Sequence, residues 1–170
     1  QRLGAVSLQA RLRFQQDPGF GAMAFATAEA PKFKPELRAQ VFAEVARAAF
    51  VEKAYATSVS TWIEALNRST QRDWLKEAAR AARKTGKPEV LVSFFEKQQQ
   101  RSPRDVRWAV ATRELRVATD NLPGGIEMAR IAAQVRPERK ELWLEAVDLM
   151  ERDYRFLEAA DFLEGWNAQR

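Results

Sequence analysis

The chain has 170 residues, of which 46% are hydrophobic and 30% are charged, and its formal net charge is +5. This length suits one domain of ordinary size, and the hydrophobic fraction excludes a disordered tail. Cysteine and histidine are absent, which excludes disulfide bonds, thiolate metal sites, and the commonest general base and metal ligand. No segment approaches roughly 18 uninterrupted apolar residues, so we expect no transmembrane helix and a soluble protein of the cytoplasm or periplasm.

The first half of the chain contains few clear boundaries. Residues 6–14 alternate apolar and polar side chains and are compatible with a strand, but their position relative to Pro35 favours a helix. The cluster Asp17-Pro18-Gly19 predicts the turn that ends it. Residues 52–61 contain no comparable cluster, so one long helix could run through them.

The second half alternates helical patterns with turn clusters. Apolar residues at spacings of three and four predict helices over 74–82 and 142–150, and residues 90–95 form the apolar face of another helix. Clusters rich in Gly and Pro at 85–88 and 120–125 predict turns, and Asp153-Tyr154-Arg155-Phe156 is a weaker stop.

A period of 34 residues links these elements. Pro35, Pro103 and Pro137 are separated by 68 and 34 positions, which are two periods and one. Trp74 and Trp108 are also 34 positions apart. The period divides the chain into five units, each predicted to be two antiparallel helices: 4–37, 38–71, 72–105, 106–139 and 140–170.

The last unit shows most clearly which repeat family this pattern resembles. Trp143 matches the early aromatic of a tetratricopeptide repeat, Ala146 and Val147 its close-packing pair, Phe156 its turn aromatic and Ala159 its small site in the second helix. The resemblance is specific over 72–170 and degenerate over 1–71. It implies an all-α fold, a right-handed α-solenoid of about five antiparallel helical hairpins forming a single domain over 1–170.

The tryptophans at this spacing are predicted to lie in the core, except Trp166, which we expect to be partly exposed near the end of the stack. Because the chain begins at Gln1 and its last helix has no polar capping run, we expect it to be part of a longer protein.

Catalytic constellations are not evident. Carboxylates at helical spacing, such as Glu141 with Glu145 and Asp148 with Glu151, are typical of a solvated face. We therefore predict a protein that is not an enzyme and that uses no cofactor and no metal.

The resemblance implies that the first helix of each unit lines a concave groove that holds another protein or peptide. It places Phe42, Ala46, Ala49 and Phe50 at the apolar end of this groove, and Glu141, Leu144, Asp148 and Glu151 at its acidic end. Between them it places Asp73, Lys76, Arg80, Arg83 and Lys84 in the third unit, and Arg107, Val110 and Glu114 in the fourth. The candidate binding residues are Phe42, Lys76, Arg80, Arg83, Lys84 and Arg107.

Such a groove suits a partner peptide that combines acidic residues with an apolar anchor. The simpler alternative is that the basic residues only make one helix face soluble. A nucleic-acid-binding helical array is a further alternative, although the modest net charge and the acidic last unit disfavour it. The chain could also be a non-catalytic arm of a larger enzyme or of a secretion or assembly complex.

Overall fold

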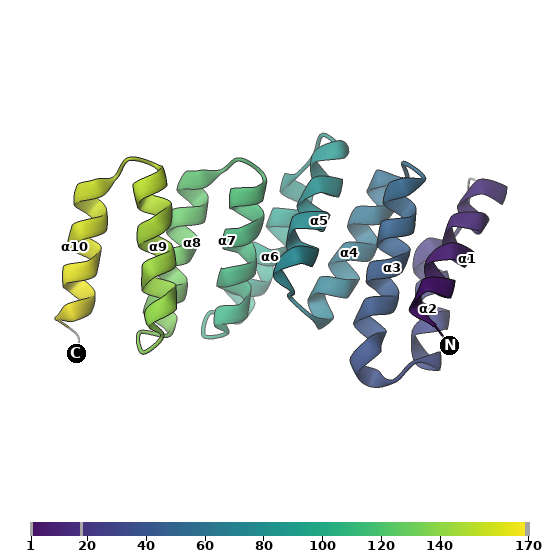
Figure 1. Cartoon of the computed structure of the whole chain (residues 1–170), viewed down its shortest axis with the longest axis horizontal. Helices are drawn as coiled ribbons and strands as arrows, with labels where there is room; N and C mark the ends of the chain where they lie inside the picture. The colour runs from purple at the N-terminus through teal and green to yellow at the C-terminus, as the bar shows by residue number, and fades with distance from the viewer. Residues whose placement is uncertain (1, 18, 169–170) are drawn as a thin grey trace. The chain divides into compact units, whose positions relative to one another are not determined.

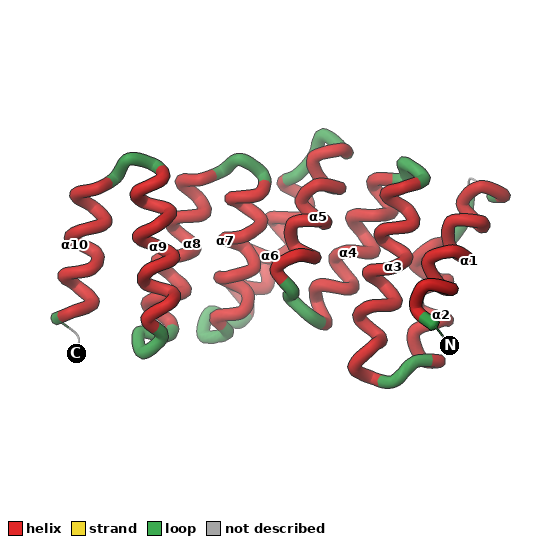
Figure 2. Tube along the Cα trace, viewed as in Figure 1, coloured by secondary structure: helices red, strands yellow, loops and turns green. Residues whose placement is uncertain are grey.

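The fold is described by a computed structural model that defines residues 2–17 and 19–168. Within these residues there are ten α-helices and two short 3-10 helices, joined by short loops, and no strand (Figure 2). The helices are α1 (Leu3–Gln16), α2 (Ala22–Glu29), η1 (Ala30–Lys32), η2 (Pro35–Leu37), α3 (Arg38–Val51), α4 (Tyr55–Arg68), α5 (Arg72–Lys84), α6 (Glu89–Arg101), α7 (Val106–Ala118), α8 (Leu122–Val135), α9 (Lys140–Arg152) and α10 (Phe156–Asn167). The predicted all-α class is confirmed, and residues 6–14 are helical. Pro18, in the predicted first turn, lies outside the described residues.

The helices fall into two compact units, residues 1–91 and 92–170, with the boundary inside α6. In the first unit α3 packs against α1, α2 and α4, and α5 packs against α4. In the second unit α8 packs against α7 and α9, and α9 packs against α10 (Figure 1). Within each unit, successive helices therefore pack against each other as hairpins, as the resemblance implies.

A left-handed turn residue ends the first helix of the hairpins. Lys53, Asp120 and Tyr154 have φ of 62°, 64° and 59° and follow α3, α7 and α9. At the first of them, Ala54 N donates to Ala49 O at 2.8 Å and Lys53 N donates to Phe50 O at 3.1 Å. This pair of bonds is the Schellman motif, and it recurs at Asp120 and Tyr154.

Lys53 corrects the prediction that one helix could run through residues 52–61. A residue in the left-handed region cannot continue a right-handed helix, so α3 ends at Val51 and α4 begins at Tyr55. Gly86, with φ of 71°, occupies the corresponding place after α5. The turn positions 53, 86, 120 and 154 thus repeat at intervals of 33 or 34 residues.

The predicted tryptophans lie in the core of their units. Trp74 packs against Trp62 at 6.1 Å between ring centroids, and Trp108 packs against Phe95 at 5.9 Å. All four of these aromatic side chains are buried. Small residues complete the packing, since most of the buried side chains of α3 and α5 are alanines, which let neighbouring helices approach closely.

The end of the second unit differs from the prediction. Trp166 is only 8% exposed, so the expectation that it is partly exposed was wrong. Its ring stacks on Trp143 at 6.2 Å, and Trp143 also contacts Phe162 at 4.5 Å. The indole N–H of Trp143 donates to Pro137 O at 3.2 Å, which satisfies the polar atom of this buried ring.

Candidate interaction surface

The exposed face of α5 carries the basic residues that the sequence singled out. Trp74, Leu75 and a set of alanines bury the opposite face of the helix. Lys76, Arg80, Arg83 and Lys84 are exposed, and their spacing of three and four residues places them on one stripe. Arg83 and Lys84 lie in the last turn, where the helix dipole favours positive charge. We call these four residues the α5 basic stripe.

Arg80 connects the stripe to an aromatic surface. Its guanidinium lies 5.1 Å from the centroid of the half-buried Phe50 ring, and Phe50 packs against Tyr55 at 5.4 Å. Stacking on the ring holds a long side chain in place while leaving its N–H donors available. The stripe therefore places the guanidinium of Arg80 beside a half-buried aromatic surface.

Glu77, the acidic neighbour of the stripe, forms its ion pair with a residue of another helix. Arg47 of α3 donates to both of its carboxylate oxygens, at 2.7 and 2.9 Å, and donates to Glu44 at 2.7 Å. The bonds to Glu77 raise the pKa of the Arg47 guanidinium above its ordinary value, against the opposing effect of partial burial. Within the described residues Lys76 and Lys84 have no ion-pair partner, and Glu77 is bound by Arg47 instead of by either lysine.

Phe42 does not belong to this surface. Its side chain is only 2% exposed, and the guanidinium of Arg68 lies 4.3 Å from its ring centroid. Ala46 and Ala49 are also buried, because this face of α3 packs against neighbouring helices. Of the residues proposed for the apolar end of the groove, Phe50 alone keeps appreciable exposure.

The predicted residues of α7 lie in the second unit and differ in environment. Arg107 is exposed, but its side chain donates to Asp105 at 3.1 Å and its guanidinium lies 4.3 Å from the Trp108 ring centroid. Glu114, expected at the groove, is buried and accepts a bond from the buried Arg113 at 2.7 Å. Arg113 also pairs with Glu145 of α9, so these groups join helices to one another instead of facing a partner.

The described residues contain no cluster of three or more acidic, cysteine or histidine residues placed to hold a metal ion. Two open hollows of about 310 and 320 Å³ lie along α8 and α10, and both are bordered by the Arg130–Glu158 ion pair.

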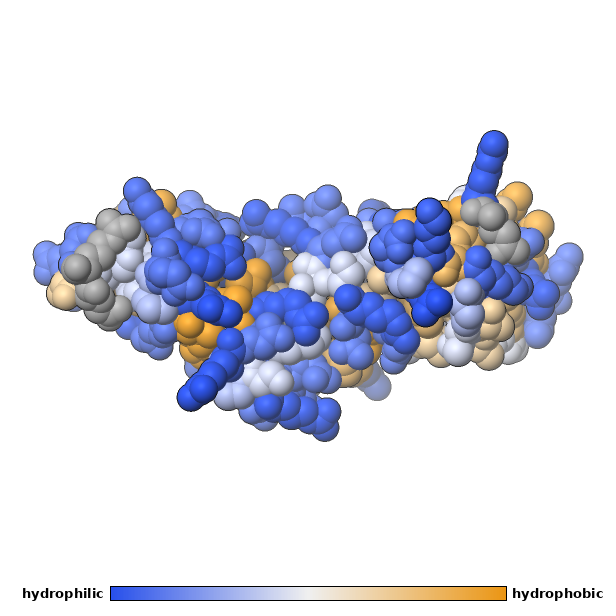
Figure 3. All heavy atoms as spheres, turned by 90° about the horizontal axis from the view of Figure 1, so that it is seen from below, coloured by the Kyte–Doolittle hydropathy of each residue, from blue (hydrophilic) through white to orange (hydrophobic). Residues whose placement is uncertain are grey.

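Hydrophilic side chains cover most of the side seen in Figure 3, with hydrophobic ones visible between them. None of the described helices combines the length and apolar character that crossing a bilayer requires.

Comparison with known proteins reveals a likeness in fold alone. No family model and no curated protein matches the chain. Among solved structures, a MamA RS-1 double mutant is similar over 98% of this chain and 93% of its own, with a TM-score of 0.46 at 14% identity. MamA from Desulfovibrio magneticus RS-1, starting at its residue 41, has a TM-score of 0.44 at 15% identity, covering 86% of this chain and 92% of its own. MamA MSR-1 has a TM-score of 0.45 at 11% identity, with coverage of 98% and 95%. The α5 basic stripe is therefore defined by this chain's own residues and not by the comparison with the MamA structures.

Proposed function

We propose that this chain is a non-catalytic interaction scaffold, and that the α5 basic stripe binds an acidic segment of a partner protein. The observation that carries this proposal is the unmatched charge of the two lysines of the stripe. Lys76 and Lys84 have no ion-pair partner among the described residues, and Arg80 is held on the Phe50 ring. Glu77, which could have neutralised them, is bound by Arg47.

The chemistry of the partner follows from these side chains. Carboxylates accept charge-assisted hydrogen bonds from guanidinium and ammonium groups, and an ordered arginine loses less entropy on binding than a free one. The half-buried ring of Tyr55, which packs against Phe50, provides an apolar contact near Arg80. A segment with two or three acidic residues beside one apolar residue fits this surface, and its affinity should fall as salt rises.

A nucleic acid would be attracted by the same charges, but the surroundings of the stripe favour a protein. Binding to single strands uses exposed aromatic rings on which bases stack. Here the Phe50 ring is half-buried and Arg80 already lies over it. The basic residues could therefore contact only the phosphates of a nucleic acid, and such contacts supply affinity but do not hold the bases.

The test compares two charge-matched variants in affinity capture from the source organism, followed by mass spectrometry. Lys76→Glu with Lys84→Glu cancels the net positive charge of the four-residue stripe. Lys34→Glu with Lys53→Glu reverses two lysines of the same unit that are exposed and likewise have no ion-pair partner within the described residues. We expect the first variant to lose a protein partner that the wild type and the second variant both capture. Equal capture by both variants would refute the binding role of the stripe, and a captured nucleic acid would refute the choice of partner.

A further inference from the structure

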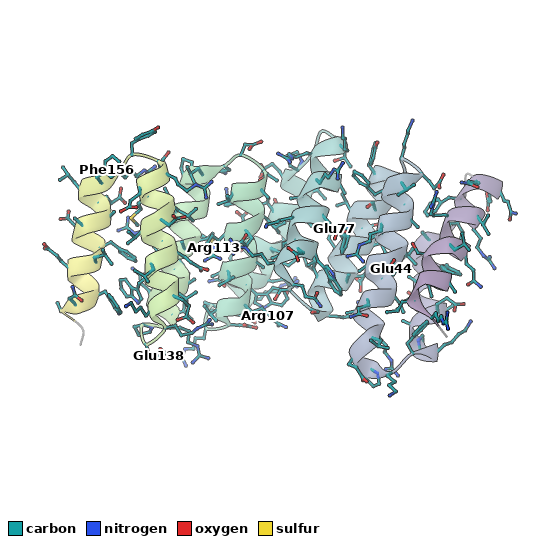
Figure 4. The ribbon with its side chains drawn as sticks, in the orientation of Figure 1. Glu44, Glu77, Arg107, Arg113, Glu138 and Phe156 are labelled. Atoms are coloured by element: carbon teal, nitrogen blue, oxygen red, sulfur yellow. The ribbon has the colours of Figure 1, made fainter. Side chains whose placement is uncertain are left out.

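The turn between α9 and α10 exposes a cluster of large apolar side chains. The exposed fractions are 83% for Tyr154, 59% for Phe156 and 85% for Leu157. The rings of Tyr154 and Phe156 meet nearly edge to face, at 6.2 Å between centroids and 78° between planes. Figure 4 shows Phe156 at the end of the hairpin where the two helices join. We call these three residues the turn patch.

Tyr154 occupies a position for which its side chain is poorly suited. Its φ of 59° places it in the left-handed region, where the corresponding turn after α5 has Gly86. A glycine avoids the steric cost that a side chain brings there. The tyrosine ring lies largely in solvent, so packing within the chain does not compensate for this cost. Lys53 and Asp120 share this conformation, so what sets Tyr154 apart is a large ring exposed next to two other exposed apolar side chains, and such a patch favours contact with another molecule.

The surroundings of the turn patch are acidic. Residues 148–164 contain six acidic residues and two arginines. Arg155 is occupied within the hairpin, since it donates to Asp153 at 2.7 Å and to Glu158 at 3.5 Å. The bond to Asp153 is the main reason that the pKa of Arg155 is raised. Its charge is therefore already matched and does not repel a cationic partner.

Several carboxylates near the turn patch are available. Asp148 and Glu151 are exposed on the last turns of α9, and Asp161 and Glu164 are exposed on α10. Within the described residues none of these four has an ion-pair partner. Asp161 and Glu164 follow Leu157 by four and seven residues, so all three lie on one face of α10. The surface is thus apolar at the turn and net negative along both helices that leave it, since these four carboxylates outnumber Arg152, an exposed cation in the last turn of α9.

We propose that the turn patch docks a cationic segment of a partner protein, one that carries an apolar or aromatic anchor flanked by lysine or arginine. The anchor would contact Tyr154, Phe156 and Leu157, and the cations would pair with the carboxylates of α9 and α10. Charge complementarity selects this occupant, because an acidic or neutral apolar segment would leave those carboxylates unmatched. The site is separate from the α5 basic stripe, so either site can fail its test without the other.

The test uses a short fluorescein-labelled peptide of leucine and lysine at helical spacing, titrated with the whole chain and followed by fluorescence anisotropy. A second peptide with glutamate in place of lysine controls for charge. Tyr154→Gly removes the ring and also relieves the backbone, so it should weaken binding by about fivefold or more while raising the melting temperature. Binding loss together with a stability gain cannot come from unfolding.

Lys53→Gly is the matched control, because it makes the same change at the corresponding turn of the first unit. It should raise the melting temperature and leave peptide binding unchanged. Leu157→Ser, which removes a largely exposed side chain, should also weaken binding, whereas Leu8→Ser at another exposed leucine should not. Unchanged affinity in Tyr154→Gly and Leu157→Ser, or equal binding of the glutamate peptide, would overturn the proposal. So would a wild-type dimer in sedimentation that Tyr154→Gly dissociates while the lysine peptide fails to bind.

Discussion

Substitutions at equivalent left-handed turn positions should change the stability of the protein in opposite directions. Gly86 has φ of 71°, and a Cβ added there would meet no atom within 4 Å. Gly86→Ala therefore changes the backbone energy and creates no clash. The left-handed conformation costs a side-chain-bearing residue about 1–2 kcal/mol, and alanine recovers about 0.5–1 kcal/mol by restricting the unfolded chain. The expected net loss of stability is about 1 kcal/mol.

Introducing glycine at Lys53 should raise the stability instead of lowering it. Lys53 adopts φ of 62° and is exposed, so Lys53→Gly loses no buried contact and should gain about 0.5–1 kcal/mol. Gly165→Ala is a control within α10, where an added Cβ also meets nothing within 4 Å and φ is not positive. Alanine is favoured inside a helix, so this variant should be more stable than the wild type.

Thermal unfolding monitored by circular dichroism measures these differences. A change of 1 kcal/mol shifts the melting temperature by roughly 4–8 °C for a domain of 60–100 residues and roughly 2–4 °C for one of 150–250 residues. The size of the shift thus also reports whether the two compact units unfold separately or together. A melting temperature for Gly86→Ala equal to or above the wild-type value would refute the assignment of left-handed strain to these turns.

The core and the charged surface give three more predictions. Trp143→Ala removes a buried ring at the centre of an aromatic cluster and should cost about 3–5 kcal/mol in guanidinium unfolding; a cost below about 1 kcal/mol would contradict its burial. Gly125→Ala would place a Cβ 2.6 Å from Val117 Cγ2 and should cost about 1–3 kcal/mol, whereas a neutral result in scanning fluorimetry would mean that the valine moves freely. The pKa of Glu141 lies below its ordinary value, mainly because its own backbone N–H donates to the carboxylate and secondly because Arg139 pairs with it. Its contribution to stability is therefore fully present above the pKa of the unfolded chain, and it is lost as the pH falls through the pKa of the folded protein. In a carbon-13 NMR titration Arg139→Ala should raise this pKa only part of the way, and an unchanged value would exclude the arginine.

Periodicity predicted the features that every repeat shares. The spacing of Trp74 and Trp108 indicated both the repeat length and the burial of these side chains, because an apolar face recurs with each hairpin. Turns with Gly and Pro were also predictable. The break at Lys53 was not, since lysine in the left-handed region has no sequence signal comparable to glycine.

Features that depend on contacts between residues far apart in the chain could not be predicted from the sequence. Arg47 and Glu77 are 30 residues apart, and only the packing of their helices shows that Glu77 pairs with Arg47 and not with a residue of the basic stripe. Phe42 was placed on the groove because its position in the repeat matched, but contacts with other helices bury it. The exposure of Tyr154 likewise depends on how the turn directs its side chain.

The claim that the α5 basic stripe contacts a partner protein can be tested most directly by photo-crosslinking. Benzoylphenylalanine would replace Asp73, an exposed residue of α5 three positions before Lys76, or Ser60, an exposed residue of α4, and each protein would be irradiated in an extract of the source organism. We predict an adduct at position 73 that protease digests and nuclease does not, with no equivalent adduct at position 60. A nuclease-sensitive adduct, or adducts of equal yield at both positions, would contradict the account.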